Sequence, residues 1–180
     1  MKKTFLATIC LFAGMSIYAQ QIDVQPVPQK VIPATQTIKL TGTYLLNGIN
    51  DANPFAAEAL KTILGTSESM KGGMKVFIGE RGDKAVSKYK KFIPAQAEGY
   101  FVRISPKEIV LAGYDERGTY YAVQTFRQLM ENGQVPVTEI TDWPDIRFRG
   151  VVEGFYGTPW SHEARLRHLK FYGQNKMNTY

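Results

Sequence analysis

Cysteine is almost missing from this sequence, and long apolar runs are missing altogether. The single cysteine, Cys10, lies in a short N-terminal stretch that is predicted to be removed. The remaining chain therefore has no disulfide, no thiol nucleophile and no cysteine metal ligand. No apolar run approaches the roughly 20 residues that a membrane-spanning helix needs, so none is predicted to cross a bilayer. With 10 Phe, 10 Tyr and 44% hydrophobic residues, the composition excludes a disordered chain.

Neither charge nor histidine points to a nucleic-acid or metal partner. The 22 Lys and Arg exceed the 16 Asp and Glu by six, and we expect the excess to be spread along the chain. No nucleic-acid partner is therefore predicted. His162 and His168 are the two histidines, and Leu166 stands where a zincin helix carries its second histidine. Because six residues put these imidazoles on different helix faces, we predict no metal site and no cofactor.

Residues 1–19 have the order of a signal peptide. Lys2 and Lys3 precede an apolar stretch of about 13 residues at 5–17, and Ala19 suits the position before a cleavage site. Removal of this segment takes away two lysines and no acidic residue, which lowers the formal charge from +6 to +4. We therefore expect an exported protein, periplasmic or extracellular, with no membrane anchor after cleavage.

Residues 22–145 mix strand and helix patterns and are predicted to form one α+β domain. A proline-containing extended lead-in occupies 21–36. Asn53 and Pro54 are typical of a helix start and Gly65 of a helix end, and a second helix is predicted over 115–131. A short helix is expected to end near Lys90. The predicted strands are 37–40, 43–46, 74–79, 99–105, 108–113 and 136–141, with 99–105 and 108–113 paired as a hairpin.

The composition changes after Pro144. Residues 146–157 form a β-rich run rich in glycine, a helix is predicted to open at 158–161 and end at Gly173, and 175–180 has the pattern of another strand. This order is that of a βαβ unit, which requires a parallel sheet. Because such a unit needs further strands and helices to bury both faces, we expect 146–180 to be the start of a larger domain.

The glycine-rich run is the most informative part of the sequence. It reads Arg149-Gly150-Val151-Val152-Glu153-Gly154-Phe155-Tyr156-Gly157-Thr158-Pro159-Trp160. Glycines at a strand end favour close backbone approach, and neighbouring aromatic rings suit the apolar face of a sugar. A tightly packed turn with core aromatics explains the same spacing equally well, so both interpretations stay open at this point.

The same run, followed by Asn175-Lys176-Met177-Asn178-Thr179-Tyr180, resembles the opening of the catalytic barrel of glycoside hydrolase family 84, the family that includes O-GlcNAcases, in its secreted Bacteroides-type members. The resemblance implies a hexosaminidase-type N-terminal α+β domain at 22–145 and, at 146–180, the first βα unit of a truncated (β/α)8 TIM barrel. It also implies a retaining exo-β-N-acetylglucosaminidase acting on GlcNAc-bearing glycans by substrate-assisted catalysis through an oxazoline.

The resemblance also assigns residues. The catalytic Asp pair of the family would lie beyond Tyr180, so we expect this chain to be inactive by itself. Gly154 would accept a sugar hydroxyl hydrogen bond on its backbone carbonyl, and Tyr156 would line the same pocket. Glu153 shares a strand face with Arg149, which favours a structural ion pair over catalysis. A family 20 β-hexosaminidase and a non-catalytic carbohydrate-binding domain are the alternatives.

Overall fold

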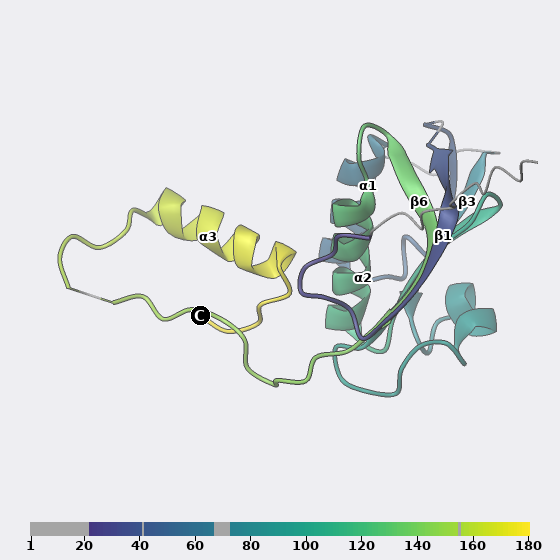
Figure 1. The fold of residues 1–180 in the computed structure, drawn as a ribbon. Helices are drawn as coiled ribbons and strands as arrows, with labels where there is room; N and C mark the ends of the chain where they lie inside the picture. Colours follow the sequence, from purple (N-terminus) through teal and green to yellow (C-terminus); the bar gives the residue numbers. More distant parts are fainter. Residues whose placement is uncertain (1–21, 41, 67–72, 155) are drawn as a thin grey trace, which may run out of the picture.

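The computed structural model describes residues 22–40, 42–66, 73–154 and 156–180; the predicted signal peptide lies outside this part. A six-stranded sheet forms the body of the molecule, with two helices on one face and a short 3₁₀ helix on the other (Figure 1). The elements are β1 (Lys30–Lys39), β2 (Tyr44–Asn47), α1 (Pro54–Leu64), β3 (Met74–Glu80), η1 (Lys84–Tyr89), β4 (Tyr100–Ile104), β5 (Glu108–Gly113), α2 (Glu116–Leu129), β6 (Gln134–Asp142) and α3 (His162–Gln174).

The two longer predicted helices of the domain are confirmed, α1 together with both ends, whereas α2 ends at Leu129, two residues before the predicted Glu131. The side chain of Asn53 accepts hydrogen bonds from the backbone N–H groups of Phe55 and Ala56 at 2.9 and 3.2 Å, and Gly65 ends α1 with φ 64°. At α2 the Asp115 carboxylate accepts from the Gly118 N–H at 2.9 Å. Short side chains that satisfy free backbone groups therefore set these boundaries.

The sheet is mixed, in the order β1-β6-β4-β5-β3-β2. Strands β4 and β5 form the predicted antiparallel hairpin, whereas β2, β3 and β5 run parallel to one another. The larger core lies between this sheet and the helices α1 and α2; a smaller cluster on the opposite face packs η1 against β4 and β5. This is a mixed α/β sheet domain, in agreement with the α+β prediction for 22–145.

The structure corrects the predicted boundaries of the first two strands. β1 begins at Lys30, inside the predicted extended lead-in, and contains Pro33. A proline is tolerated there because β1 is an edge strand that pairs with β6 alone, and the register shifts between Pro33 and Thr37. In addition, β2 covers Tyr44–Asn47 rather than 43–46.

The described residues of this run, 146–154 and 156–157, do not form the predicted strand. The described part of this segment makes one strand pairing, a parallel bridge between Gly150 and Thr179. A parallel strand extends only where a neighbour offers its backbone groups, and the described residues offer none to Val152 and Glu153. α3 begins at His162 with Ser161 as its cap, later than predicted, and runs one residue past Gly173.

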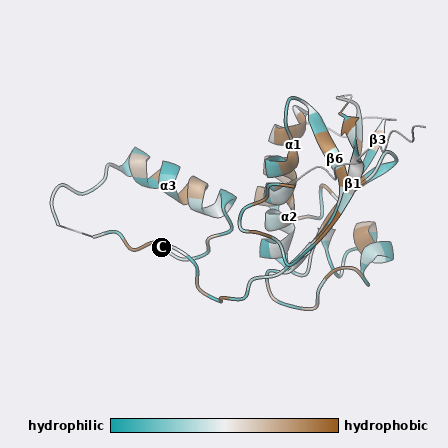
Figure 2. Ribbon diagram, viewed as in Figure 1, coloured by the Kyte–Doolittle hydropathy of each residue, from teal (hydrophilic) through white to brown (hydrophobic). Residues whose placement is uncertain are grey.

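The C-terminal segment extends away from the sheet domain (Figure 1), and no residue of α3 is buried. Figure 2 colours the ribbon of α3 in teal, white and pale brown, a mixture of hydrophilic and hydrophobic residues, and several apolar side chains of the C-terminal segment are exposed. The exposed ones include Ile146, Phe148, Val152, Leu166, Leu169 and Phe171. Among the described residues, no helix has the length and apolarity to cross a membrane. The described part of 146–180 therefore contains one isolated helix and a single parallel bridge, and the first βα unit of a barrel stays a prediction.

Candidate functional site at the 149–157 segment

The glycine-rich run is held at its beginning by the chain end. The Arg149 carbonyl accepts hydrogen bonds from the backbone N–H groups of Asn178 at 2.8 Å and Thr179 at 3.0 Å, and the Val151 N–H donates to the Thr179 carbonyl at 3.3 Å. A Cβ added at Gly150 would lie 1.7 Å from that same carbonyl oxygen. Only glycine permits such a close approach of two backbones.

A buried carboxylate, Glu98, ties this pair of segments to the domain. It accepts hydrogen bonds from Arg149 Nη2 at 2.5 Å, Asn178 Nδ2 at 2.8 Å and Arg117 Nη1 at 3.0 Å. Burial raises the pKa of Glu98, but the hydrogen bonds from Asn178, Arg149 and Arg117 outweigh it and lower the pKa below its ordinary value. We call these four residues the Glu98 junction.

Arg149 is the central cation of the junction. Besides Glu98, its guanidinium donates to the Lys176 carbonyl at 3.0 Å and the Ile146 carbonyl at 2.7 Å. Its side chain is 19% exposed and that of Glu98 is 8% exposed. Arg149 therefore binds both sides of the segment while its charge is neutralised inside the domain, which orients the start of the glycine-rich run.

A second buried charge lies beside the junction. Lys176 Nζ is 3.8 Å from Asp142 Oδ2, which also accepts the Tyr100 hydroxyl at 2.7 Å, and Thr125 donates to that hydroxyl at 2.8 Å. Burial lowers the pKa of Lys176 to about 8, partly offset by the negative charge of Asp142. A pocket of about 200 Å³ borders these groups and is lined by Tyr121 and Trp143 among others.

Glu153 forms an ion pair, as predicted, but its partner is Arg165 of α3 and not Arg149. Both N–O distances of this two-pronged pair are 2.8 Å, and Glu153 also accepts hydrogen bonds from the Tyr180 hydroxyl and, at 3.4 Å, from the Trp160 N–H. The hydrogen bonds from Arg165 and Tyr180 lower the pKa of Glu153 to about 2. An ionised Glu153 has no proton to donate near neutral pH, so it holds the loop to α3.

Aromatic rings line the side of α3 that faces this loop. The Trp160 ring meets His168 edge-on with centroids 4.3 Å apart, His168 lies 6.0 Å from Tyr172, and Tyr172 stacks on Tyr180 at 6.2 Å. His168 Nδ1 is buried with no hydrogen-bond partner in the described part of the chain. His168 therefore acts as a packing residue here. Trp160 packs against His168 and belongs to this row of rings more than to an open surface on which a sugar ring could stack.

The two predicted substrate contacts, Gly154 and Tyr156, lie at the far end of the run. A Cβ at Gly154 would meet only Tyr156 Cδ2 at 3.7 Å, an ordinary contact, and Tyr156 is fully exposed. Nothing in the described residues requires glycine at position 154, and Phe155 lies outside them. Their role as sugar contacts stays a prediction, as does the absence of a metal; the described residues group no three His, Cys, Asp or Glu side chains suited to a metal ion.

Sequence reasoning missed Glu98, Asp142 and Lys176. Glu98 stands in a loop with no periodic pattern, and its backbone has φ 62°, which is uncommon outside glycine. Lys176 also has a positive φ. Of the three residues, it alone could have been found from the sequence, because it lies in the Asn175–Asn178 segment on which the family resemblance rests. Their buried partners lie 34 or more positions away along the chain.

The sheet domain is that of a glycoside hydrolase N-terminal region. Residues 21–143 match the family described as glycosyl hydrolase family 20, domain 2, and residues 149–180 match a family described as beta-N-acetylglucosaminidase. The chain belongs to the first of these families. It is a hexosaminidase-related N-terminal region of the family 84 and family 20 type.

Solved structures support this assignment. The chain is similar to CpGH84B, a family 84 enzyme, with 30% identity, a TM-score of 0.78, and coverage of 88% of this chain and 29% of that one. CpGH84D shares 21% identity, with a TM-score of 0.75 and coverage of 88% and 30%. The fold also matches the Flavobacterium johnsoniae chitobiase, at 16% identity and a TM-score of 0.60 over 86% of this chain and 26% of that one. The chain thus spans less than a third of the length of these structures.

Proposed function

We propose that this chain is the N-terminal part of an exported, retaining exo-β-N-acetylglucosaminidase of the O-GlcNAcase-like family 84. In this proposal, residues 1–19 are the signal peptide, 22–145 the supporting domain and 146–180 the start of the catalytic barrel. The observation that carries it is the 30% identity to CpGH84B over 88% of the chain, with a TM-score of 0.78. The family 20 enzymes compared here give TM-scores of 0.51 to 0.61.

The exposed apolar surface of 146–180 supports the barrel assignment. A helix with no buried residue and side chains such as Leu166, Leu169 and Phe171 in solvent has no hydrophobic reason to form alone. Further strands and helices of a barrel would cover these side chains. Gly150 and Thr179 would then belong to the first two parallel strands, whose pairing is already begun.

Hydrolysis in this proposal follows a substrate-assisted route. The 2-acetamido oxygen of GlcNAc attacks the anomeric carbon while an Asp beyond Tyr180 protonates the departing oxygen, and water then opens the oxazoline with retention. Gly154 accepts a hydrogen bond from a sugar hydroxyl, and Tyr156 lies in the same site. Glu153 is excluded as the acid because its carboxylate is paired with Arg165 and ionised. The 180-residue chain is then inactive by itself.

Activity measurements test the proposal directly. Hydrolysis of an aryl β-N-acetylglucosaminide is measured for the 180-residue chain and for the same chain extended through its natural downstream coding sequence. We expect turnover only from the extended protein, with retention at the anomeric carbon. Turnover by the 180-residue chain would contradict the assignment of the catalytic residues. An inactive extended protein that binds GlcNAc would favour a carbohydrate-binding domain instead.

A family 20 β-hexosaminidase is the second candidate, since residues 21–143 match a domain named for that family. The downstream residues separate the two. An Asp-Asp pair after the fourth barrel strand supports family 84, whereas an Asp-Glu pair supports family 20.

A further inference from the structure

Within the sheet domain, residues 81–91 form the segment with the highest density of positive charge. They contain five basic residues and one acidic residue, a net charge of +4. Residues 146–180 carry a further net charge of +4, from six basic and two acidic residues, over a segment three times as long. The segment comprises the turn after β3, the helix η1 and the turn that follows, on the sheet face opposite α1 and α2. We call Arg81, Lys84, Lys88, Lys90 and Lys91 the basic face.

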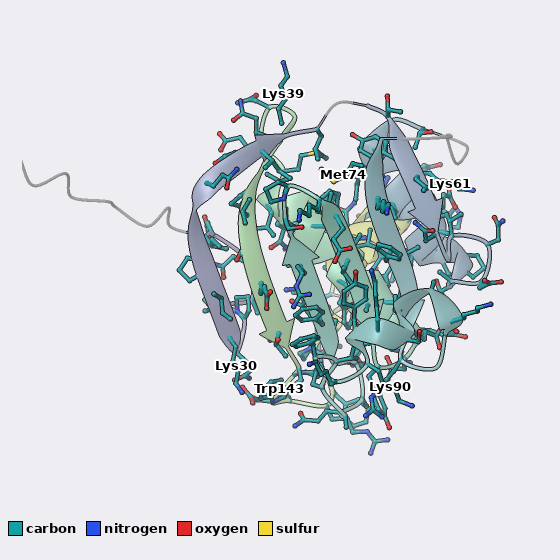
Figure 3. The ribbon with its side chains drawn as sticks, turned by 90° about the vertical axis from the view of Figure 1, so that its right-hand side faces the viewer. Lys30, Lys39, Lys61, Met74, Lys90 and Trp143 are labelled. Carbon is teal, nitrogen blue, oxygen red and sulfur yellow. The ribbon has the colours of Figure 1, made fainter. Side chains whose placement is uncertain are left out.

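Three lysines of the basic face form no ion pair with a carboxylate of the described residues. They are Lys84, Lys90 and Lys91, and all three are exposed. Lys90 projects from the lower edge of the sheet in Figure 3, which views this side of the molecule. These ammonium groups are therefore free to meet an anion from outside.

The nearby carboxylates are already engaged. Glu108 pairs with Lys88 at 3.3 Å and accepts the Tyr89 hydroxyl at 2.5 Å. Asp83 accepts the Glu80 N–H at 2.7 Å, which closes the turn after β3. Glu139 pairs with Arg103 at 2.7 Å. These three carboxylates therefore already have partners other than Lys84, Lys90 and Lys91.

The basic face stands on a rigid apolar base. Val86, Tyr89 and Ile93 are buried in the smaller core cluster, which anchors η1 to the sheet. Lys88 Nζ lies 4.3 Å from the Phe77 ring centroid and Lys91 Nζ 4.9 Å from that of Phe92. Lys88 and Lys91 are thus held over aromatic rings before any partner arrives, which reduces the entropy that these two side chains lose on binding.

We propose that the basic face binds an anionic glycan, a polysaccharide that carries sulfate or carboxylate groups. Four of its five cations are lysines, compact point charges that suit dispersed anionic groups. Nucleic-acid surfaces instead combine arginine forks with open aromatic faces, and here Lys88 and Arg103 cover the faces of Phe77 and Phe92. The site lies on the domain, separate from Gly154, and does not depend on catalysis.

Binding of the 180-residue chain to heparin, used as a sulfated glycan probe, tests the proposal. The variant Lys84→Gln, Lys90→Gln, Lys91→Gln removes the three free cations. The matched control, Lys30→Gln, Lys39→Gln, Lys61→Gln, makes the same charge change at positions away from η1 (Figure 3). We expect the first variant to lose at least about tenfold in affinity with a shallower salt dependence, and the control to stay within about twofold.

Other results would overturn the proposal. Equal losses in both triple variants would show that only net charge matters, and no heparin binding by the unsubstituted chain would remove the site. Tighter binding of duplex DNA than of heparin would assign the surface to nucleic acid. Hyaluronan, which carries carboxylates alone, is the parallel probe. If it binds as well as heparin, the proposal holds and carboxylate groups are sufficient for binding. The single variant Lys90→Gln must show part of the loss in heparin affinity. This variant keeps the test valid if the triple variant misfolds.

Discussion

Replacing Glu98 by alanine tests how the C-terminal segment is attached to the domain. The side chain of Glu98 is 8% exposed and accepts hydrogen bonds from Arg117, Arg149 and Asn178. Its removal leaves the Arg149 guanidinium, 19% exposed, without its carboxylate. Breaking a buried ion pair by removal of one partner costs about 3–5 kcal/mol.

The remaining partners add little to this cost. Arg117 is 66% exposed, so its pair contributes about 0–1 kcal/mol after solvent screening. The Asn178 hydrogen bond contributes about 1 kcal/mol. Because Arg149 regains some contact with water in the variant, we take the low end of the range and expect Glu98→Ala to cost about 3 kcal/mol.

Urea unfolding followed by circular dichroism measures this cost, with amide hydrogen exchange as the local readout. The N–H groups of Val151, Asn178 and Thr179 bond across the segment and should exchange faster in the variant. Glu58→Ala, at an exposed position of α1, is the matched control and should change stability by less than about 0.5 kcal/mol. If Glu98→Ala behaves like this control, the junction does not hold the segment and the reasoning is wrong.

Four further predictions concern pH, glycine and export. Folding lowers the pKa of Lys176 to about 8, so the unfolded chain binds more protons than the folded chain above that pH. The free energy of unfolding should therefore rise from about pH 8 to 9.5. In urea titrations, Lys176→Met should flatten this rise. Gly150→Ala should abolish the exchange protection of the Thr179 N–H, whereas Gly154→Ala should leave it unchanged; equal effects would contradict the backbone contact. In the extended enzyme, Gly154→Val should lower kcat/KM by about a hundredfold or more with an unchanged melting temperature, and a fully active variant would remove the proposed sugar contact. Sequencing of the exported protein should place its N-terminus next to Ala19, and a chain that still begins at Met1 would refute the signal peptide.

Local chemistry was sufficient to predict much of the domain. Asn53, Pro54 and Gly65 predicted both ends of α1, and the spacing around Pro106 predicted the β4–β5 hairpin. These features depend on residues within a few positions of one another, which satisfy each other's backbone groups. An ion pair of Glu153 was also predicted, but the structure forms it with Arg165 of α3 and without the strand whose alternation suggested it.

Features that depend on distant partners were decided by the tertiary structure. β1 begins at Lys30, within the lead-in predicted over 21–36, because β6 pairs with it there, and Glu153 pairs with Arg165 because α3 folds back over the loop. The strand predicted at 146–157 is reduced to one bridge because a parallel strand needs neighbours on its sides.

The sequence by itself determined the helix ends, the hairpin, the near absence of cysteine and the motif that resembles family 84. The tertiary structure decided that Glu98, 51 positions before Arg149, neutralises it. Burial and charge pairing join residues that are remote in sequence, so no local pattern encodes them. A helix cap needs only its own turn of chain, whereas a buried ion pair needs the whole fold to exclude water around it.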